Sequence, residues 1–229
     1  MDIKIIGEPM PVAICTVSAG ETLITEKGAM SWMTSNMKMD TGTNGGLGKA
    51  FGRMVSGESL FQNKYTATGG DGEIAFAATV MGSIRTYEVS PGRSIVAQKG
   101  SFLASTSGVD IEVHYKKKFG ASAFGGEGFI MQKISGSGTV IVQIDGYAVD
   151  YDLAAGEELT IDTGHVAVMD ESCTMDVRSV SGMKNMFLGG EGIFNTVVTG
   201  PGRVTLQTMP ISRLATAIHP FLPQPTSAN

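Results

Sequence analysis

Residues 18–23 read Ser-Ala-Gly-Glu-Thr-Leu, and this short pattern decides the fold because it occurs three times. It returns as Ser-Pro-Gly-Arg-Ser-Ile at 90–95 and as Ala-Ala-Gly-Glu-Glu-Leu at 154–159. In every copy an apolar residue lies three positions after the glycine and a second glycine lies eight positions after it. This spacing predicts a tandem repeat in which glycine turns separate short strands.

A second landmark follows in each copy, where a Gly-Glu pair precedes an apolar stretch. The glutamates are Glu58, Glu127 and Glu191, and each pair leads to a Gly-x-Gly at 70–72, 136–138 or 200–202. The first glycine of each copy lies at position 20, 92 or 156, so the copies begin 72 and then 64 residues apart. Insertions in the first copy account for the difference between these two spacings. Three landmarks in a fixed order make a chance repeat improbable.

Apolar residues alternate with polar ones after the second glycine of each copy. The alternating positions are Met37, Met39 and Thr41, then Val109, Ile111 and Val113, then Cys173, Met175 and Val177. A period of two is typical of a strand with one buried face. We therefore expect the methionines at 37, 39 and 175 to fill the core.

The repeat predicts an all-β protein of three tandem β-roll or sandwich units around a pseudo-threefold axis. The expected units are 1–85, 86–147 and 148–215, followed by a loose, proline-broken tail at 216–229. The third unit has no closing strands after Met209, so we expect N-terminal strands to complete it. One short helix is expected near 47–55 of the first unit, since Leu47, Phe51 and Met54 fall on one face.

Composition excludes several classes of protein. The net charge of -5 argues against a nucleic-acid partner, since phosphate binding needs a basic surface. Cys15 and Cys173 make no disulfide framework and favour a reducing, cytoplasmic location in a bacterial-type protein. No apolar run approaches the roughly 20 residues of a membrane span.

Metal, cofactor and catalytic sites are not predicted. The three histidines, His114, His165 and His219, lie far apart and outside metal-binding spacings. The glycine-rich stretch 42–49 fails the phosphate-loop pattern, because Thr43 and Ala50 replace required residue types. We therefore expect no cofactor and no enzymatic nucleophile, with Cys173 facing the core.

Two sets of repeated carboxylates are candidates for a binding site. Glu58, Glu127 and Glu191 lie between a glycine and a strand, where carboxylates commonly accept turn amides. The second set, Asp40, Glu112 and Asp176, alternates against the buried face and is expected in solvent. Convergence of either set on an axis would require a cation or raised pKa values.

Basic residues form two local clusters. Lys49 and Arg53 share the side of the expected helix that lies opposite its apolar stripe, and Lys116, Lys117 and Lys118 are consecutive. Either cluster could contact an anionic membrane surface or nucleic acid. A solvated face is the simpler interpretation.

Three segments resemble a known family. Gly57–Phe61, Gly189–Gly192 and Gly200–Thr208 are similar to motifs of the AIM24 family, and the resemblance covers about residues 5–215. It implies three β domains like that of the tryptophan RNA-binding attenuator protein. Mitochondrial members are implicated in inner-membrane organisation. The resemblance brings no catalytic residue with it.

The sequence therefore favours a non-enzymatic scaffold or binding protein with a protein or membrane-surface partner. The alternative is a small-molecule- or RNA-binding protein that uses clefts between the repeats, and an undetected enzyme ranks last. Unpaired sheet edges could also join copies of the chain into a homo-oligomer.

Overall fold

The structure is a computed structural model that describes residues 1–42, 62–117, 128–179 and 194–223. After β1 (Asp2–Ile6), the strands fall into three successive sets of six. The first unit contains β2 (Val12–Val17), β3 (Thr22–Thr25), β4 (Trp32–Met33), β5 (Met37–Gly42), β6 (Gln62–Ala67) and β7 (Gly72–Ala77). The second contains β8 (Gly82–Val89), β9 (Ile95–Gln98), β10 (Phe102–Thr106), β11 (Val109–Lys117), β12 (Phe129–Gly136) and β13 (Gly138–Asp145). The third contains β14 (Ala148–Leu153), β15 (Glu158–Asp162), β16 (Val166–Asp170), β17 (Thr174–Ser179), β18 (Phe194–Thr199) and β19 (Gly202–Gln207).

Every unit pairs its six strands in the same way. The first, sixth and third strands form one antiparallel sheet, and the fourth, fifth and second strands form another. The turn between the first and second strands of each unit depends on a glycine. Gly20, Gly92 and Gly156 have φ of 85°, 82° and 78°. Glycine adopts this left-handed conformation without the steric cost that a Cβ brings. The sequence prediction of an all-β fold is confirmed, and its sheets are antiparallel.

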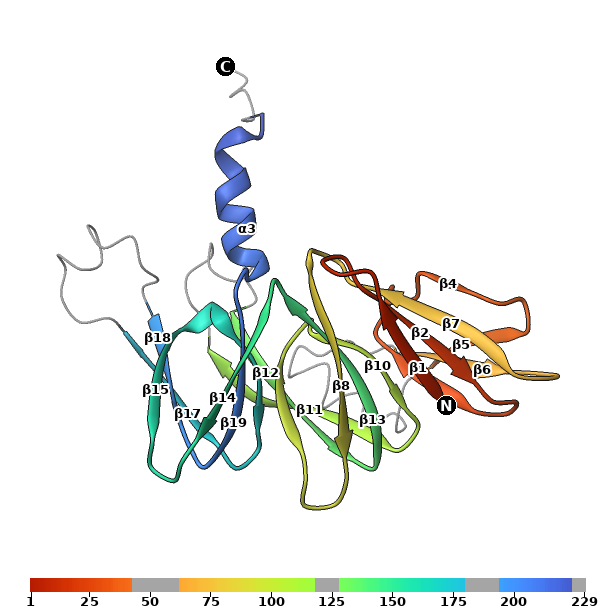
Figure 1. The fold of residues 1–229 in the computed structure, drawn as a ribbon, viewed down its shortest axis with the longest axis horizontal. Coiled ribbons are helices and arrows are strands. Elements are labelled where there is room, and N and C mark those ends of the chain that lie inside the picture. Colours follow the sequence, from red (N-terminus) through yellow and green to blue (C-terminus); the bar gives the residue numbers. More distant parts are fainter. Residues whose placement is uncertain (43–61, 118–127, 180–193, 224–229) are drawn as a thin grey trace.

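The sheets continue from one unit into the next. β5, β6 and β3 of the first unit join β10, β13 and β8 of the second in one six-stranded sheet. β11, β12 and β9 of the second unit likewise join β16, β19 and β14 of the third. The units consequently lie side by side in a row (Figure 1). This pairing does not fix the axis that relates them, and the pseudo-threefold axis stays a prediction.

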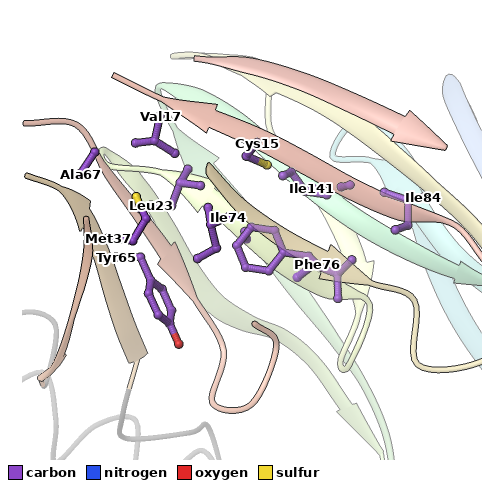
Figure 2. Packing of buried hydrophobic residues seen from close by; sticks show 13 residues of the cluster. Cys15, Val17, Leu23, Met37, Tyr65, Ala67, Ile74, Phe76, Ile84 and Ile141 are labelled. Atoms are coloured by element: carbon purple, nitrogen blue, oxygen red, sulfur yellow. The ribbon is translucent and has the colours of Figure 1, made fainter. Parts of the chain in front are cut away.

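Each hydrophobic core draws residues from two units. The first core takes Cys15 and Phe76 from one sheet of the first unit and Leu23 and Tyr65 from the other. Figure 2 shows these side chains packed together with Ile84 and Ile141. The last two residues belong to β8 and β13, so the second unit helps to close the first core. The second and third cores are shared between neighbouring units in the same way.

The alternating strand predicted after the second glycine is found in every unit, as β5, β11 and β17. Met37, Val109 and Cys173 are buried as expected. Of the other two methionines expected in the core, Met175 is only partly buried against the third core, and Met39 is 54% exposed. Met39 lies on β5, an outer strand of its sheet.

The N-terminal strands do not complete the third unit. β2 pairs with β1 and β7, and β3 pairs with β6 and β10. Among the described residues, β15, β17 and β18 form a separate three-stranded sheet. The reason is that β1 already covers the free edge of β2, and β3 is used at the first junction between units.

The C-terminal segment is more regular than the predicted loose tail from 216. α3 (Ile211–Ile218) is helical and η3 (His219–Phe221) is a turn of 3-10 helix. Apolar residues at 211, 214, 215 and 218 give the helical spacing that the prediction overlooked. Pro220 is compatible with η3 because the first turn of a helix does not need its N–H. The helix expected near 47–55 lies outside the described residues.

Candidate functional site

A cleft of about 470 Å³ lies between the first and second units. Its walls come from β1, from the first glycine turn and from strands β8, β10 and β13. The lining residues are Met1, Ile3, Ile5, Glu21, Thr86, Glu88, Thr106, Gly138 and Thr139. The cleft is therefore a product of the junction between units and not of either unit alone.

Polar groups in this cleft bond to one another. The Thr139 hydroxyl donates to Oε1 of Glu88 over 2.7 Å, and the Thr139 N–H donates to Oγ1 of Thr106 over 3.0 Å. Oε2 of Glu21 accepts the Ser18 N–H over 3.0 Å, and this hydrogen bond is the main cause that lowers the pKa of Glu21. Glu21 also forms an ion pair with the Met1 ammonium over 3.6 Å, so Glu88 supplies the net negative charge of the cleft. A carboxylate beside isoleucines suits a neutral or cationic molecule better than a phosphate.

The predicted site residues Glu58, Glu127, Glu191, Lys49 and Arg53 all lie outside the described residues. The second carboxylate set can be placed. Asp40, Glu112 and Asp176 are exposed and lie on β5, β11 and β17, which belong to three different sheets. They do not converge.

Each of these three carboxylates has one basic side chain near it. Asp40 lies opposite Lys64 in the strand register, and Glu112 lies opposite Lys133. Oδ2 of Asp176 accepts a hydrogen bond of 2.8 Å from Nε of Arg178. The expectation of solvated carboxylates on the outer face is confirmed for this set.

The side chains of His165, Cys15 and Cys173 have structural roles. Nδ1 of His165 lies 2.7 Å from the Gln207 carbonyl oxygen, so it must carry the proton and donate. Burial raises the pKa of Cys15 to about 12, and burial is also the main cause that raises the pKa of Cys173. Within the described parts of the chain, no group of three or more His, Cys, Asp or Glu residues is arranged to hold a metal ion.

The lysine cluster at 116–118 is only partly described. Nζ of Lys117 donates to the carbonyl oxygen of Val177 over 2.5 Å, which links β11 to β17. This ammonium is therefore engaged in joining two units, and Lys118 lies outside the described residues.

Sequence reasoning missed two polar features. Glu157 Oε2 accepts the Ala154 N–H over 2.8 Å, as Glu21 does with Ser18, so both glutamates cap their glycine turns. The Gly-Glu pair at 20–21 and 156–157 was a visible signal for this. The second feature is an ion pair between Arg85 and Asp150, which no spacing in the sequence connects.

The fold and the cleft define a class: tandem-repeat all-β chains whose antiparallel sheets run across unit boundaries. The crystal structure of protein SPYM3_0169 from Streptococcus pyogenes has this fold, with a TM-score of 0.78 and 24% sequence identity. The match covers 96% of this chain and 99% of that one.

The sequence profile of the family described as mitochondrial biogenesis AIM24 matches residues 3–209. This protein belongs to the AIM24 family, as the motifs in its sequence indicated. No curated protein matches the chain. The family match ends just before α3. In the described parts of the chain, no helix has the length and apolar character needed to cross a membrane.

Proposed function

We propose that this AIM24-family protein is a non-enzymatic scaffold that binds a partner protein through α3. The observation that carries the proposal is the apolar face of this helix. Ile211, Leu214 and Ile218 share one side of α3, and none of its eight described residues is buried. An amphipathic helix normally buries its apolar stripe against another element.

The base of α3 is held in place by two contacts. The Ile211 N–H donates to Oδ2 of Asp145 over 2.9 Å, and Arg213 forms an ion pair with Asp162. The helix consequently projects from the row of units in a defined direction (Figure 1). A fixed direction reduces the entropy lost when a partner covers the apolar stripe.

A protein surface suits α3 better than an anionic membrane. The chain carries a net charge of -5, and the one cationic side chain of the helix, Arg213, is paired with Asp162. Helices that bind anionic lipid usually carry several free lysines or arginines. We place the protein in the reducing cytoplasm of a bacterium, and two buried cysteines without a disulfide support that location.

The experiment compares Ile218→Asp with Ala217→Asp. The two variants add the same charge at neighbouring positions of the last helical turn, but only the first interrupts the apolar stripe. A partner is captured by cross-linking, identified, and then purified for a binding measurement with wild type and both variants. We expect Ile218→Asp to weaken binding at least about tenfold, equivalent to about 1.4 kcal/mol, and Ala217→Asp to bind like wild type.

Equal binding by both variants would overturn the proposal. Binding to phosphatidylcholine vesicles that contain phosphatidylglycerol, lost in Ile218→Asp, would instead assign the helix to a membrane surface. If the protein turns over a substrate, and the Ile218→Asp variant retains that activity, the non-enzymatic assignment is refuted.

The second candidate is small-molecule binding in the cleft, and its carboxylates favour it over RNA binding. Glu88 would repel a phosphate backbone but attract a cationic compound, whereas Glu21 is already paired with the Met1 ammonium. A ligand that raises the melting temperature of wild type but not of Glu88→Gln would support this candidate.

A further inference from the structure

The two junctions inside the chain follow one rule. At the first junction β3 pairs with β10, and at the second β9 pairs with β16. In both cases the second strand of one unit pairs antiparallel with the third strand of the next unit. The register is also the same, because Leu23 lies opposite Thr106 and Ile95 lies opposite Asp170.

The ends of the chain carry the two halves of a third junction. β15 is the second strand of the last unit, and among the described residues it pairs only with β18. β4 is the third strand of the first unit, and within the same described ranges it pairs only with β7. Figure 1 shows these two strands at opposite ends of the long axis, so they cannot pair within one chain.

The exposure of β4 shows what its missing neighbour would cover. Trp32 occupies the position of Ala104 and Val168, and Met33 occupies that of Ser105 and Met169. Those four counterparts are at most 2% exposed, whereas Trp32 is 48% and Met33 is 37% exposed. A large apolar pair on an open sheet edge is a template for strand addition.

We infer that β15 of one copy pairs with β4 of a second copy, so that the chains assemble head to tail. The register of the internal junctions places Ile161 opposite Trp32 of the other copy, Thr160 opposite Met33 and Leu159 opposite Thr34. The occupant is a second copy of this chain because each edge has its complement on the same molecule. This inference is independent of the function proposed for α3.

Backbone groups on both edges point outward at the required places. The Glu157 carbonyl accepts the Gly200 N–H, and the Thr34 N–H donates to the Glu73 carbonyl, so both residues face their own sheets. Strand residues alternate in the side to which their N–H and C=O point. Thr160 and Met33 therefore direct these groups away from β18 and β7, toward a new strand.

Among the described residues, a helix and not another strand follows the last unit. β8 and β14 begin within five residues of the ends of β7 and β13, whereas β19 is followed by the helix at Ile211. In the described residues no strand follows β19 to cover β15. Because the contact uses two different surfaces, repetition gives a closed ring or an open filament, depending on the rotation at each contact.

The test uses one variant on each edge. Thr160→Pro removes an outward N–H from β15, and Met33→Pro does the same on β4; edge positions tolerate proline. Sedimentation velocity over a concentration series should show wild type as species larger than the monomer and each variant alone as a monomer. Thr160→Val, which keeps the N–H, is the control and should assemble like wild type.

Mixing the two proline variants distinguishes this arrangement from any other. Each variant retains one intact edge, so the mixture should form a one-to-one dimer and nothing larger. The emission of Trp32, the single tryptophan of the chain, should move to shorter wavelength in that dimer. If a proline variant fails the circular dichroism check for folding, Thr160→Lys and Met33→Lys replace the pair.

Three results would overturn the inference. One is a wild type that stays monomeric at every concentration, and another is assembly that neither edge variant reduces. The third is a mixture of the two variants that remains entirely monomeric.

Discussion

Arg85 and Asp150 join the second unit to the third, with Nη1 of Arg85 2.7 Å from each carboxylate oxygen of Asp150. Thr205 adds a hydrogen bond of 2.7 Å to Oδ1 of the same carboxylate. Partial burial raises the pKa of Asp150, but the hydrogen bonds from Arg85 and Thr205 and the charge of Arg85 outweigh it, and the net shift is downward. A carboxyl with a lowered pKa stabilises the fold above its ordinary pKa and loses that contribution as the pH falls through the folded value.

We predict that Arg85→Ala lowers the free energy of unfolding by about 1–2 kcal/mol at neutral pH, after allowance for solvent at this partly exposed pair. Wild type and variant should become similar in stability as the pH falls from 3.8, the ordinary pKa of the group, through the lower folded value. Urea unfolding at several pH values measures the difference. The control is Arg178→Ala, which removes an exposed ion pair with Asp176 and should change stability by less than about 0.5 kcal/mol. An equal effect of both substitutions would contradict the assignment.

Asp145→Asn should stabilise the protein at neutral pH. Burial is the main cause that raises the pKa of Asp145, opposed by the hydrogen bond from the Ile211 N–H. A raised carboxyl pKa favours folding at low pH, and that contribution is lost as the pH rises through the folded value. Asparagine avoids the buried charge and still accepts the Ile211 N–H. We expect the melting temperature to rise by about 1–3 °C at pH 7 and the gain to disappear below pH 3.8. A lower melting temperature at pH 7 would show that the charge helps to hold α3.

Valine at Gly20, Gly92 or Gly156 should destabilise the fold to a similar degree. A Cβ at these positions meets no atom within 4 Å, so the cost comes from the left-handed backbone alone. We expect about 1–2 kcal/mol for each substitution. Urea midpoints that barely move would argue against their role in the turns.

Gly82→Ala should cost more than any of these three substitutions. Its Cβ would lie 2.2 Å from the carbonyl oxygen of Ile144, a backbone atom that pairs β13 with β8. We expect a loss of more than about 2 kcal/mol in the same urea assay. A smaller loss than at Gly20 would mean that the two strands separate easily.

Neither cysteine should react quickly with a disulfide reagent in the native protein. Cys15 is fully buried and Cys173 is 3% exposed, and burial raises the pKa of both thiols. The thiolate is the reactive form, so both features slow the reaction. Titration with Ellman's reagent should detect two thiols per chain in urea and none rapidly without it. A fast native reaction would place one thiol at an accessible site.

The repeat and its turns could be predicted from sequence because their signals are local. The left-handed turn at Gly20 requires a glycine, and the apolar Leu23 follows three positions later. Both can be recognised from neighbouring residues alone. The same reasoning placed Met39 in the core and failed. Whether an alternating side chain is covered depends on the neighbouring strand, and a sequence pattern contains no information on that neighbour.

Contacts between units could not be predicted for the same reason. Arg85 and Asp150 are 65 residues apart in the chain, and only the pairing of whole sheets brings them together. The cleft beside Glu88 likewise forms where two units meet. The N-terminal strands do not close the third unit as expected. Instead, the second strand of the first unit pairs with the second unit, and the second strand of the second unit pairs with the third.

Shared cores also constrain protein synthesis. The first core includes Ile84 and Ile141, so a nascent chain that has emerged only as far as β7 lacks part of its interior. Stable folding of the amino-terminal third must therefore wait until about residue 141 has left the ribosome. A fragment truncated after β7 should expose apolar surface and be a target for chaperones and proteases, although it contains all six of its own strands.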